Sequence, residues 1–439
     1  MLVSSLYMAR SAATIPGIAF IREEGGIQEY QLKSNGLRIL LVRDTSAPVA
    51  GCMVTYHVGS KNEATGYTGA THLLEHLMFK GSERFNKESG TAMEELMESR
   101  GGVVNATTWY DRTNYFEIIP KAALPTAMAI EADRMRTARI VESDRQSEMP
   151  VVRNEFERGE NLPMEALDKA MWAAAFIAHP YHHSTIGWRS DIEKVSIERL
   201  KEFYDTFYWP DNATLTIAGD FDVVEVLKLA KTEFGKHSKA PKPYPPLYTE
   251  EPKQEGQRRV IVKRSGVHMV GIAHKIPEAL HSDIPALLLL SAILGDGKTS
   301  RLYKALVDTA KATNVTTYCW QFQEPSLFET FVTMTPDATH AEVEAIMVDE
   351  YHKIAAKGVS VAELKYAKNM ARRLLADRRD GVYALLMSLN EDIATGDWRH
   401  FVTLPQSIAA VTAADIKRVA KAYFLEDQST VGWFISTNV

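Results

Sequence analysis

Cysteine is nearly absent from this chain, which has two in 439 residues, Cys52 and Cys319. Two cysteines cannot form a disulfide framework, so the fold must depend on its hydrophobic core. Long apolar runs are also absent. The longest, Ala286–Leu294, is far shorter than the ~20 residues that a membrane-spanning helix needs. We therefore expect no membrane insertion.

Neither sign of charge dominates the sequence. It has 50 Lys and Arg against 56 Asp and Glu, a formal net charge of −6, and no long basic run. Nucleic-acid-binding proteins usually carry a concentrated positive patch, so nucleic acid is not expected as a partner. A hydrophobic content of 45% with 24% charged residues is typical of a globular protein and excludes disorder. The length suggests two or three domains.

The N-terminal segment, MLVSSLYMARSAA, carries an apolar patch that precedes Arg10. A secretory signal has the reverse order, with positive charge before the apolar run. We therefore expect no intact signal peptide. We expect a soluble bacterial protein, and its compartment stays open: the cytoplasm as the chain stands, or the periplasm if the segment is the remnant of a trimmed signal.

Proline gathers in the segment 235–256, which holds Pro241, Pro243, Pro245, Pro246 and Pro252. Such a stretch favours neither helix nor central strand, so we interpret it as an extended linker. It predicts a first domain over residues 1–235, a linker over 236–256 and a second domain over 257–439.

The two halves of the chain resemble each other at an offset of 216 residues, the difference between positions 195 and 411. Val195–Leu215 aligns without gaps with Val411–Val431, and each contains a capped amphipathic helix followed by a β-rich run. The same offset places Thr71–Gly81 on Leu287–Gly297, where the apolar positions match and the polar positions do not. A tandem duplication explains both matches.

Periodic apolar patterns predict the same kinds of element in both halves. The expected strands are 37–42, 49–57, 103–108, 115–119, 214–219, 259–262, 270–274 and 328–334, and the expected helices are 125–137, 144–160, 197–207, 341–357 and 361–379. Strands joined through paired helices indicate an α+β fold. We expect two homologous sandwich domains, each a mostly antiparallel sheet flanked by helices.

The strongest chemical signal is the run His72-Leu73-Leu74-Glu75-His76. Residues i and i+4 of a helix lie one above the other, so both histidines can face one metal ion, with Glu75 nearby. A catalytic zinc takes three protein ligands and keeps one position for water, which a carboxylate can deprotonate. The order H-x-x-E-H is the inverted form of a common zinc motif. It predicts one zinc ion per chain. Ordinary buried polar groups are a weaker explanation, because burying them unpaired is costly.

The third ligand is expected on the helix predicted over residues 144–160. Glu148 and Glu155 are seven residues apart, about two helical turns, and share a face, whereas Glu157 and Glu160 lie on other faces. Either Glu148 or Glu155 can be the third ligand, with the other supporting the site from behind. Periodicity alone does not choose between them.

These motifs resemble the pitrilysin–insulinase family of zinc peptidases, which includes the mitochondrial processing peptidase. The resemblance covers nearly the whole chain. It rests on HLLEHLMFKG, on NATT at Asn105–Thr108, on VVRNEFERGEN at Val151–Asn161, on HPYHHSTIGW at His179–Trp188 and on NATLTIAGD at Asn212–Asp220. It implies two homologous α+β halves with the metal in the first.

The resemblance also implies the roles of the site residues. Zinc would be held by His72, His76 and Glu155, with Glu75 as the general base and Glu148 orienting a ligand. The implied activity is that of a zinc metalloendopeptidase acting on peptides or unfolded polypeptide segments.

The family binds its substrate as an added strand on a sheet edge. The matching segment here implies that Asn105, Ala106 and Thr107 hold the main chain of the substrate. This mode suits a peptidase, because main-chain hydrogen bonds accept any extended peptide while side-chain pockets set specificity.

One departure from the family pattern concerns a partner. Self-sufficient members carry an Arg and a Tyr, seven residues apart, in the C-terminal half, where Val307 and Asn314 stand here. Valine has no donor, and a neutral amide is a weaker oxyanion donor than tyrosine. We therefore expect a homologous partner subunit, in a heterodimer or larger assembly, to supply the pair. The alternative function is a non-catalytic, structural or peptide-holding subunit, which the intact motif disfavours.

Overall fold

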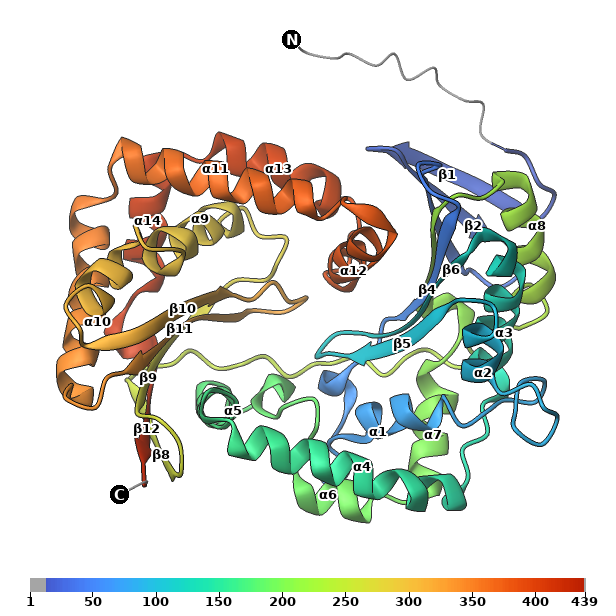
Figure 1. Cartoon of the computed structure of the whole chain (residues 1–439), viewed down its shortest axis with the longest axis horizontal. Coiled ribbons are helices and arrows are strands. Elements are labelled where there is room, and N and C mark those ends of the chain that lie inside the picture. The colour runs from blue at the N-terminus through green and yellow to red at the C-terminus, as the bar shows by residue number, and fades with distance from the viewer. Residues whose placement is uncertain (1–12, 438–439) are drawn as a thin grey trace, which may run out of the picture.

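The computed structural model describes residues 13–437 and consists of two layered α/β units, one at each end of the molecule (Figure 1). Residues 1–12, on which the expectation about a signal peptide rests, lie outside this range. Among the described helices, none combines the length and the apolar character that crossing a membrane requires.

The first sheet has seven strands in the order β1-β2-β3-β7-β4-β6-β5. The pair β3–β7 is parallel and the other neighbours are antiparallel. Nearly every residue of the central strands β4 and β7 is buried, because helices cover both faces of the sheet. The strands are β1 (Ile18–Glu24), β2 (Ile27–Leu32), β3 (Arg38–Arg43), β4 (Val49–Tyr56), β5 (Val103–Thr108), β6 (Thr113–Pro120) and β7 (Ala213–Gly219).

Two helices of the first half, α7 and α8, begin at a side-chain cap. The Ser196 hydroxyl accepts the N–H of Arg199 at the start of α7, and the Asp222 carboxylate does the same for Glu225 in α8. The helices are α1 (Ala70–Leu77), α2 (Met93–Glu98), α3 (Leu124–Thr137), α4 (Glu142–Asn161), α5 (Pro163–Ala175), α6 (Arg189–Lys194), α7 (Ile197–Phe207) and α8 (Val223–Glu233).

The second sheet has five strands in the order β10-β11-β9-β12-β8, with the parallel pair between β12 and β8. Its strands are β8 (Arg258–Arg264), β9 (Met269–Ile276), β10 (Ala312–Cys319), β11 (Ser326–Met334) and β12 (Ser429–Ser436). The helices of this half are α9 (Ile284–Gly295), α10 (His340–Lys357), α11 (Val361–Asp377), α12 (Gly381–Ala394), α13 (His400–Ala410) and α14 (Ala413–Tyr423).

The duplication and the α+β class expected from the sequence are confirmed. The order β5-β6-β4-β7-β3 of the first sheet matches β10-β11-β9-β12-β8 of the second, with the parallel pair at the same place. The offset of 216 residues takes α7 onto α14 residue for residue. The hairpin β1–β2 is an addition to the first sheet that the sequence did not predict.

Each half lends one helix to the sheet of the other half. α5 packs on β8, β9 and β12, and α12 packs on β4 and β7. Glycines in the equivalent strands β4 and β9 make room for these helices. A Cβ added to Gly51 would lie 2.4 Å from Leu386 of α12, and one added to Gly271 would lie 2.5 Å from the Met171 sulfur of α5. The two halves are therefore interlocked rather than merely joined.

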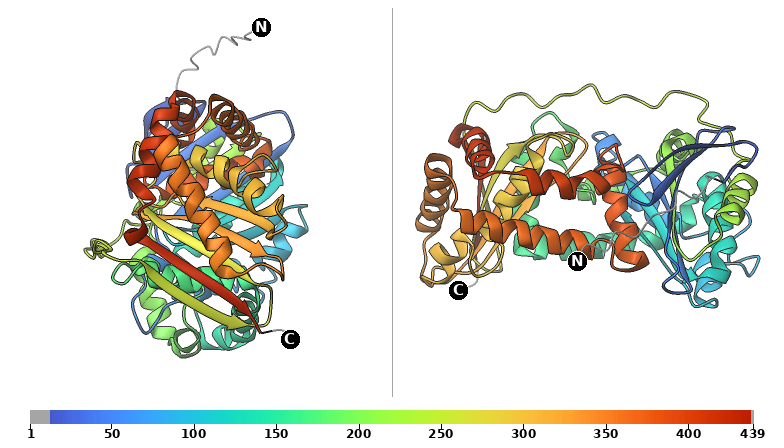
Figure 2. Two further views of the ribbon diagram at one scale, coloured as in Figure 1. Left: turned by 90° about the vertical axis from the view of Figure 1, so that its left-hand side faces the viewer. Right: turned by 90° about the horizontal axis from the view of Figure 1, so that it is seen from above.

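The proline-rich segment crosses between the halves as a long thread without helix or strand, between the end of α8 and the start of β8 (Figure 2). Glu251 holds this segment against both halves. Its carboxylate accepts the backbone N–H of Ala178 at 2.9 Å and lies 2.9 Å from Lys275 Nζ. The division into domains 1–235 and 257–439 stays a prediction about folding units, since α5 and α12 cross it in space.

Candidate metal centre

The motif helix α1 begins where two glycines allow a close approach of two backbones. Gly69, just before the helix, has φ 84°, and a Cβ there would lie 2.4 Å from the carbonyl oxygen of Ile186. Gly187 has φ 76°, and its Cβ would lie 2.3 Å from the carbonyl carbon of Thr68. Only glycine fits such positions. The loop from the HPYHHSTIGW segment therefore fixes the place where α1 starts.

Glu63, which the sequence analysis did not single out, holds the start of α1. Its buried carboxylate accepts the backbone N–H groups of Gly69 and Thr71, each at 2.7 Å. These donors have no partner within the helix. Burial raises the pKa of Glu63 to about 8, and the two N–H donors act in the opposite direction. The position of the motif thus depends on a residue outside it.

We expect Glu63→Ala to lower the free energy of unfolding by about 2 kcal/mol, because it leaves buried N–H groups without an acceptor. Urea denaturation followed by circular dichroism measures the change. Glu202→Ala, at an exposed position of α7, is the control and should change it by less than about 0.5 kcal/mol. Equal effects of the two substitutions would show that Glu63 does not anchor the helix.

Three side chains with metal-binding atoms converge, two from α1 and one from α4. Nε2 of His72 lies 3.6 Å from Oε2 of Glu155, and Nε2 of His76 lies 3.5 Å from the same oxygen. Ligand atoms at about 2.1 Å from a tetrahedral zinc are separated by about 3.4 Å. Over residues 13–437 this is the one group of its kind, with its ligand atoms within 4.8 Å of one another. The spacing therefore fits zinc.

The protonation state of His72 also fits a metal ligand. Burial, with a smaller contribution from neighbouring His76, lowers the pKa of His72 to about 3, so the ring is neutral near pH 7. A neutral imidazole is the form that coordinates a metal. Its Nδ1 is buried and lacks a hydrogen-bond partner within the described part of the chain.

Glu148 contacts the same centre from behind. Its Oε2 lies 3.1 Å from Nδ1 of His76, whose Nε2 faces Glu155, and its other oxygen pairs with Lys80. Burial opposes ionisation of Glu148, but the hydrogen bonds from Lys80 and His76 outweigh it and lower the pKa. The geometry therefore places Glu155 among the converging atoms and Glu148 behind a histidine, a choice that periodicity left open.

Glu75 faces the edge of the first sheet. Its Oε2 accepts a short hydrogen bond from the hydroxyl of Thr108, the last residue of β5. Burial raises the pKa of Glu75, while Thr108 opposes the shift. Thr108 ends the NATT match, but the sequence predicted no role of its own for it; in the structure it connects the motif helix to the edge strand.

The edge strand β5 carries the three residues expected to bind substrate. Its one neighbour in the sheet is β6, the side chain of Asn105 is exposed, and Ala106 is buried. The carbonyl of Thr107 accepts a hydrogen bond of 3.0 Å from Nη1 of Arg112. Nε of Arg112 in turn donates to Glu391 of α12 at 3.1 Å. The second half thus supports the strand through Glu391, a contact invisible in the sequence.

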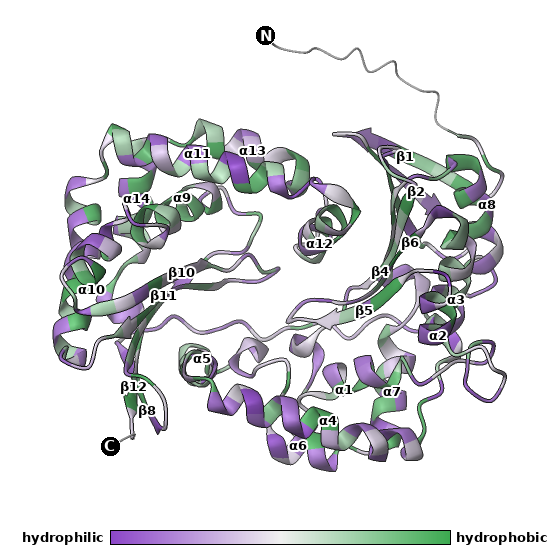
Figure 3. Cartoon of the chain, viewed as in Figure 1, coloured by the Kyte–Doolittle hydropathy of each residue, from purple (hydrophilic) through white to green (hydrophobic). Residues whose placement is uncertain are grey.

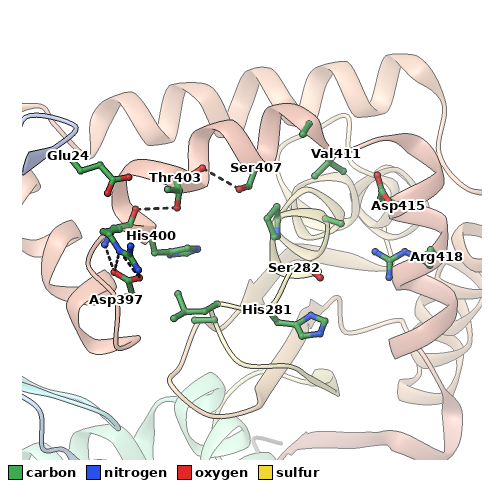
Figure 4. A pocket seen from close by; sticks show the side chains of 16 residues that line it. Glu24, His281, Ser282, Asp397, His400, Thr403, Ser407, Val411, Asp415 and Arg418 are labelled. Carbon is green, nitrogen blue, oxygen red and sulfur yellow. Dashed lines mark hydrogen bonds and ion pairs between the residues drawn. The ribbon is translucent and has the colours of Figure 1, made fainter. Parts of the chain in front are cut away.

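A separate cavity of about 620 Å³ lies between helix α13, the end of β1 and the loop that precedes α9 (Figure 4). The arginines in its wall pair within the protein, Arg399 with Asp397 at 2.9 Å and Arg418 with Asp283 at 2.6 Å. None of the converging metal-binding side chains lines it. The chemistry of the motif therefore lies elsewhere.

Comparison with known proteins gives the family. Residues 38–188 match the family model "Insulinase (Peptidase family M16)", and residues 194–371 match "Peptidase M16 inactive domain". The zinc protease PqqE of Helicobacter pylori is 31% identical over 409 residues, which cover 90% of this chain and 90% of the relative. The chain belongs to the M16 peptidase family. This confirms the resemblance seen in the motifs.

Two other similar proteins agree with this assignment. A probable mitochondrial-processing peptidase subunit beta of Arabidopsis thaliana is 26% identical over 404 residues, covering 89% of this chain and 75% of the relative. The crystal structure of a protease from Helicobacter pylori has a TM-score of 0.88 and 29% identity, covering 93% of this chain and 99% of that one. The match to the M16 insulinase model covers α1, β5 and α4, so the converging side chains lie in the half that it describes.

Proposed function

We propose that this protein is a zinc metalloendopeptidase that cleaves peptides or unfolded polypeptide segments. The observation that carries the proposal is the convergence of His72, His76 and Glu155 at zinc-compatible spacing. Membership of the M16 family supports it, since a relative of nearly the same length is named a zinc protease.

His72 and His76 would hold zinc through Nε2, and Glu155 through a carboxylate oxygen. Zinc bound there supplies a water molecule of lowered pKa and polarises the carbonyl of the scissile bond. Glu148 accepts the Nδ1 proton of His76, which fixes the ring and leaves Nε2 free for coordination.

Glu75 is the general base in this proposal. It takes a proton from the attacking water and later gives it to the leaving amine nitrogen. The Thr108 hydroxyl engages one carboxylate oxygen of Glu75, which orients the group and leaves the other oxygen for the proton. The raised pKa of a buried Glu75 suits both steps, because the group must accept the proton and release it again.

The substrate is proposed to lie extended along β5, paired with the main chain at Asn105, Ala106 and Thr107. Arg112 holds the carbonyl of Thr107 and so stiffens the end of this strand beside Glu75. The same strand that orients the base would then orient the peptide, which is what positioning for catalysis requires.

We also propose that a homologous partner subunit completes the site. Val307 ends a short π-helical turn and packs on the second core, and the Asn314 amide donates to Thr316 on β10. Neither supplies the guanidinium or the phenol of the family pattern. A relative that is itself named a subunit of a processing peptidase supports an assembly of this kind.

Metal analysis and peptidase assays of the purified chain test both proposals. We expect about one zinc per chain. Cleavage of a fluorogenic peptide should be weak with the chain alone, rise when a homologue carrying the Arg/Tyr pair is added, and disappear with 1,10-phenanthroline. A chain purified without chelators that holds no zinc would contradict the metallopeptidase. Full activity of the chain alone would contradict only the partner.

A further inference from the structure

The second half contains a cavity at the place that corresponds to the metal centre. It has a volume of about 490 Å³ and lies among α9, β10, α11, α12 and α13. The offset of 216 residues pairs four of its lining residues with metal-site residues: Leu288 with His72, Ser291 with Glu75, Ala292 with His76 and Ala371 with Glu155. The second copy of the fold therefore has a cavity at the place where the first carries the converging metal-binding side chains.

These replacements make one part of the wall apolar, because three of the four counterparts carry only aliphatic side chains. The charged lining residues of α12 are paired, Asp392 with Arg378 and Glu391 with Arg112. The helix α9 that forms one wall is apolar nearly throughout (Figure 3). Further aliphatic lining comes from Met370, Leu374, Leu375, Leu404 and Ile408. A cavity of this size with mainly apolar walls is typical of a binding site.

An edge strand lies beside this cavity, as it does beside the metal centre. β10 contributes Thr317, Tyr318 and Cys319 to the wall, and it is the edge of the second sheet as β5 is of the first. A peptide added to such an edge turns alternate side chains toward one face. The second half thus repeats the geometry of a peptide-presenting strand next to a pocket.

The cavity is also connected to the proposed substrate strand. Glu391 of α12 lines the cavity and accepts the hydrogen bond from Nε of Arg112, whose Nη1 holds the carbonyl of Thr107 on β5. α12 itself packs on the first sheet. The pocket therefore lies in the part of the second half that adjoins the peptidase half.

We propose that this cavity binds an aliphatic or aromatic side chain of the peptide substrate, at a residue away from the cleaved bond. The proposal rests on the proposed function, because its occupant is the substrate. In this proposal the second copy of the fold has an apolar pocket where the first has metal-binding residues. The pocket contributes to binding and to specificity for the peptide sequence.

Fluorescence anisotropy with labelled ten-residue peptides tests this proposal. One peptide contains only serine, threonine and lysine, and the others carry a single leucine at successive positions. Glu75→Gln protein, measured with zinc in the buffer, is used so that no peptide is cut. We expect leucine at one position to tighten the dissociation constant about tenfold, the effect of burying one such side chain.

Two variants on α11 decide whether the gain comes from this cavity. Ala371→Trp fills the cavity and should abolish the leucine gain, and Leu374→Ser, at a position 50% exposed and therefore tolerant of change, should reduce it. Ala376→Trp, exposed on the same helix and outside the lining, is the control and should keep the full gain. Equal gains in all three variants, or no gain at any peptide position, would overturn the proposal.

Failure of the pocket and failure of the peptidase function give different results. A chain that cleaves peptides but shows no leucine-dependent gain would overturn the pocket and keep the function. A chain that shows the gain and loses it in Ala371→Trp, yet holds no zinc and cuts nothing, would keep a peptide-side-chain pocket and overturn the peptidase.

Discussion

Replacing Glu75 by glutamine is expected to lower the turnover number about 10³-fold, within the range that a general base contributes. Glutamine keeps the size of the side chain and an acceptor for the Thr108 hydroxyl, so the geometry at β5 should persist. What it loses is the ability to take a proton from water. The measurement is kcat and KM for a fluorogenic peptide, together with the zinc content by atomic absorption.

Two comparisons make the Glu75 result specific. Glu157→Gln, on the face of α4 away from the site and largely exposed, should leave kcat unchanged. The zinc content of the Glu75→Gln protein should equal that of the unaltered chain, because Glu75 is not one of the three residues whose metal-binding atoms converge. A Glu75→Gln protein that retains zinc and cleaves at the normal rate would show that another group is the base.

The fold was predictable wherever a local pattern reflects burial within one half. The limits of β5 and α7 agree with the periodicity, because β5 alternates exposed and buried positions and α7 has a single apolar stripe. The strand β1 escaped notice because most of its residues are exposed, so it lacks a buried face to reveal it.

The helices α5 and α12, which each pack on the sheet of the other half, show that a local pattern does not reveal long-range contacts. α5 and α12 carry apolar residues, yet their partners are strands about a hundred or several hundred positions away in the other half. Periodicity predicts that a helix has an apolar face, but it does not predict which sheet that face packs against. Gly51 and Gly271, which admit these helices, are likewise explained only by the neighbour that each strand accepts.

The candidate site divides along the same line. His72, Glu75 and His76 were predictable because the spacing of ligands on one helix is a local property. Glu63 and Thr108 were missed because each acts through a contact made by folding, one at the start of α1 and the other across to β5. Local spacing thus predicted the residues of the candidate site, including Glu148 behind it, but not Glu63 and Thr108, whose contacts arise only on folding.

The two carboxylates of α4 offer the sharpest test of the metal assignment. Glu155→Gln should weaken zinc binding more than about 100-fold if Glu155 is one of the three protein ligands, as we propose. Glu148→Gln should weaken it about 10- to 100-fold, the usual cost of losing a partner that orients a ligating histidine. Competition with a fluorescent zinc chelator at pH 7 measures both affinities.

One matched substitution separates the loss of a zinc ligand or of its partner from a general change of charge. Glu157→Gln removes the same charge from the same helix and should leave the zinc affinity unchanged, because its carboxylate lies near Arg189 rather than at the centre. Loss of zinc in Glu148→Gln with retention in Glu155→Gln would reverse the two roles. The two glutamates share one helical face, so periodicity does not separate them. The placement of α4 against α1 puts the Glu155 carboxylate beside Nε2 of both histidines and agrees with the family resemblance, and the two affinities test that assignment.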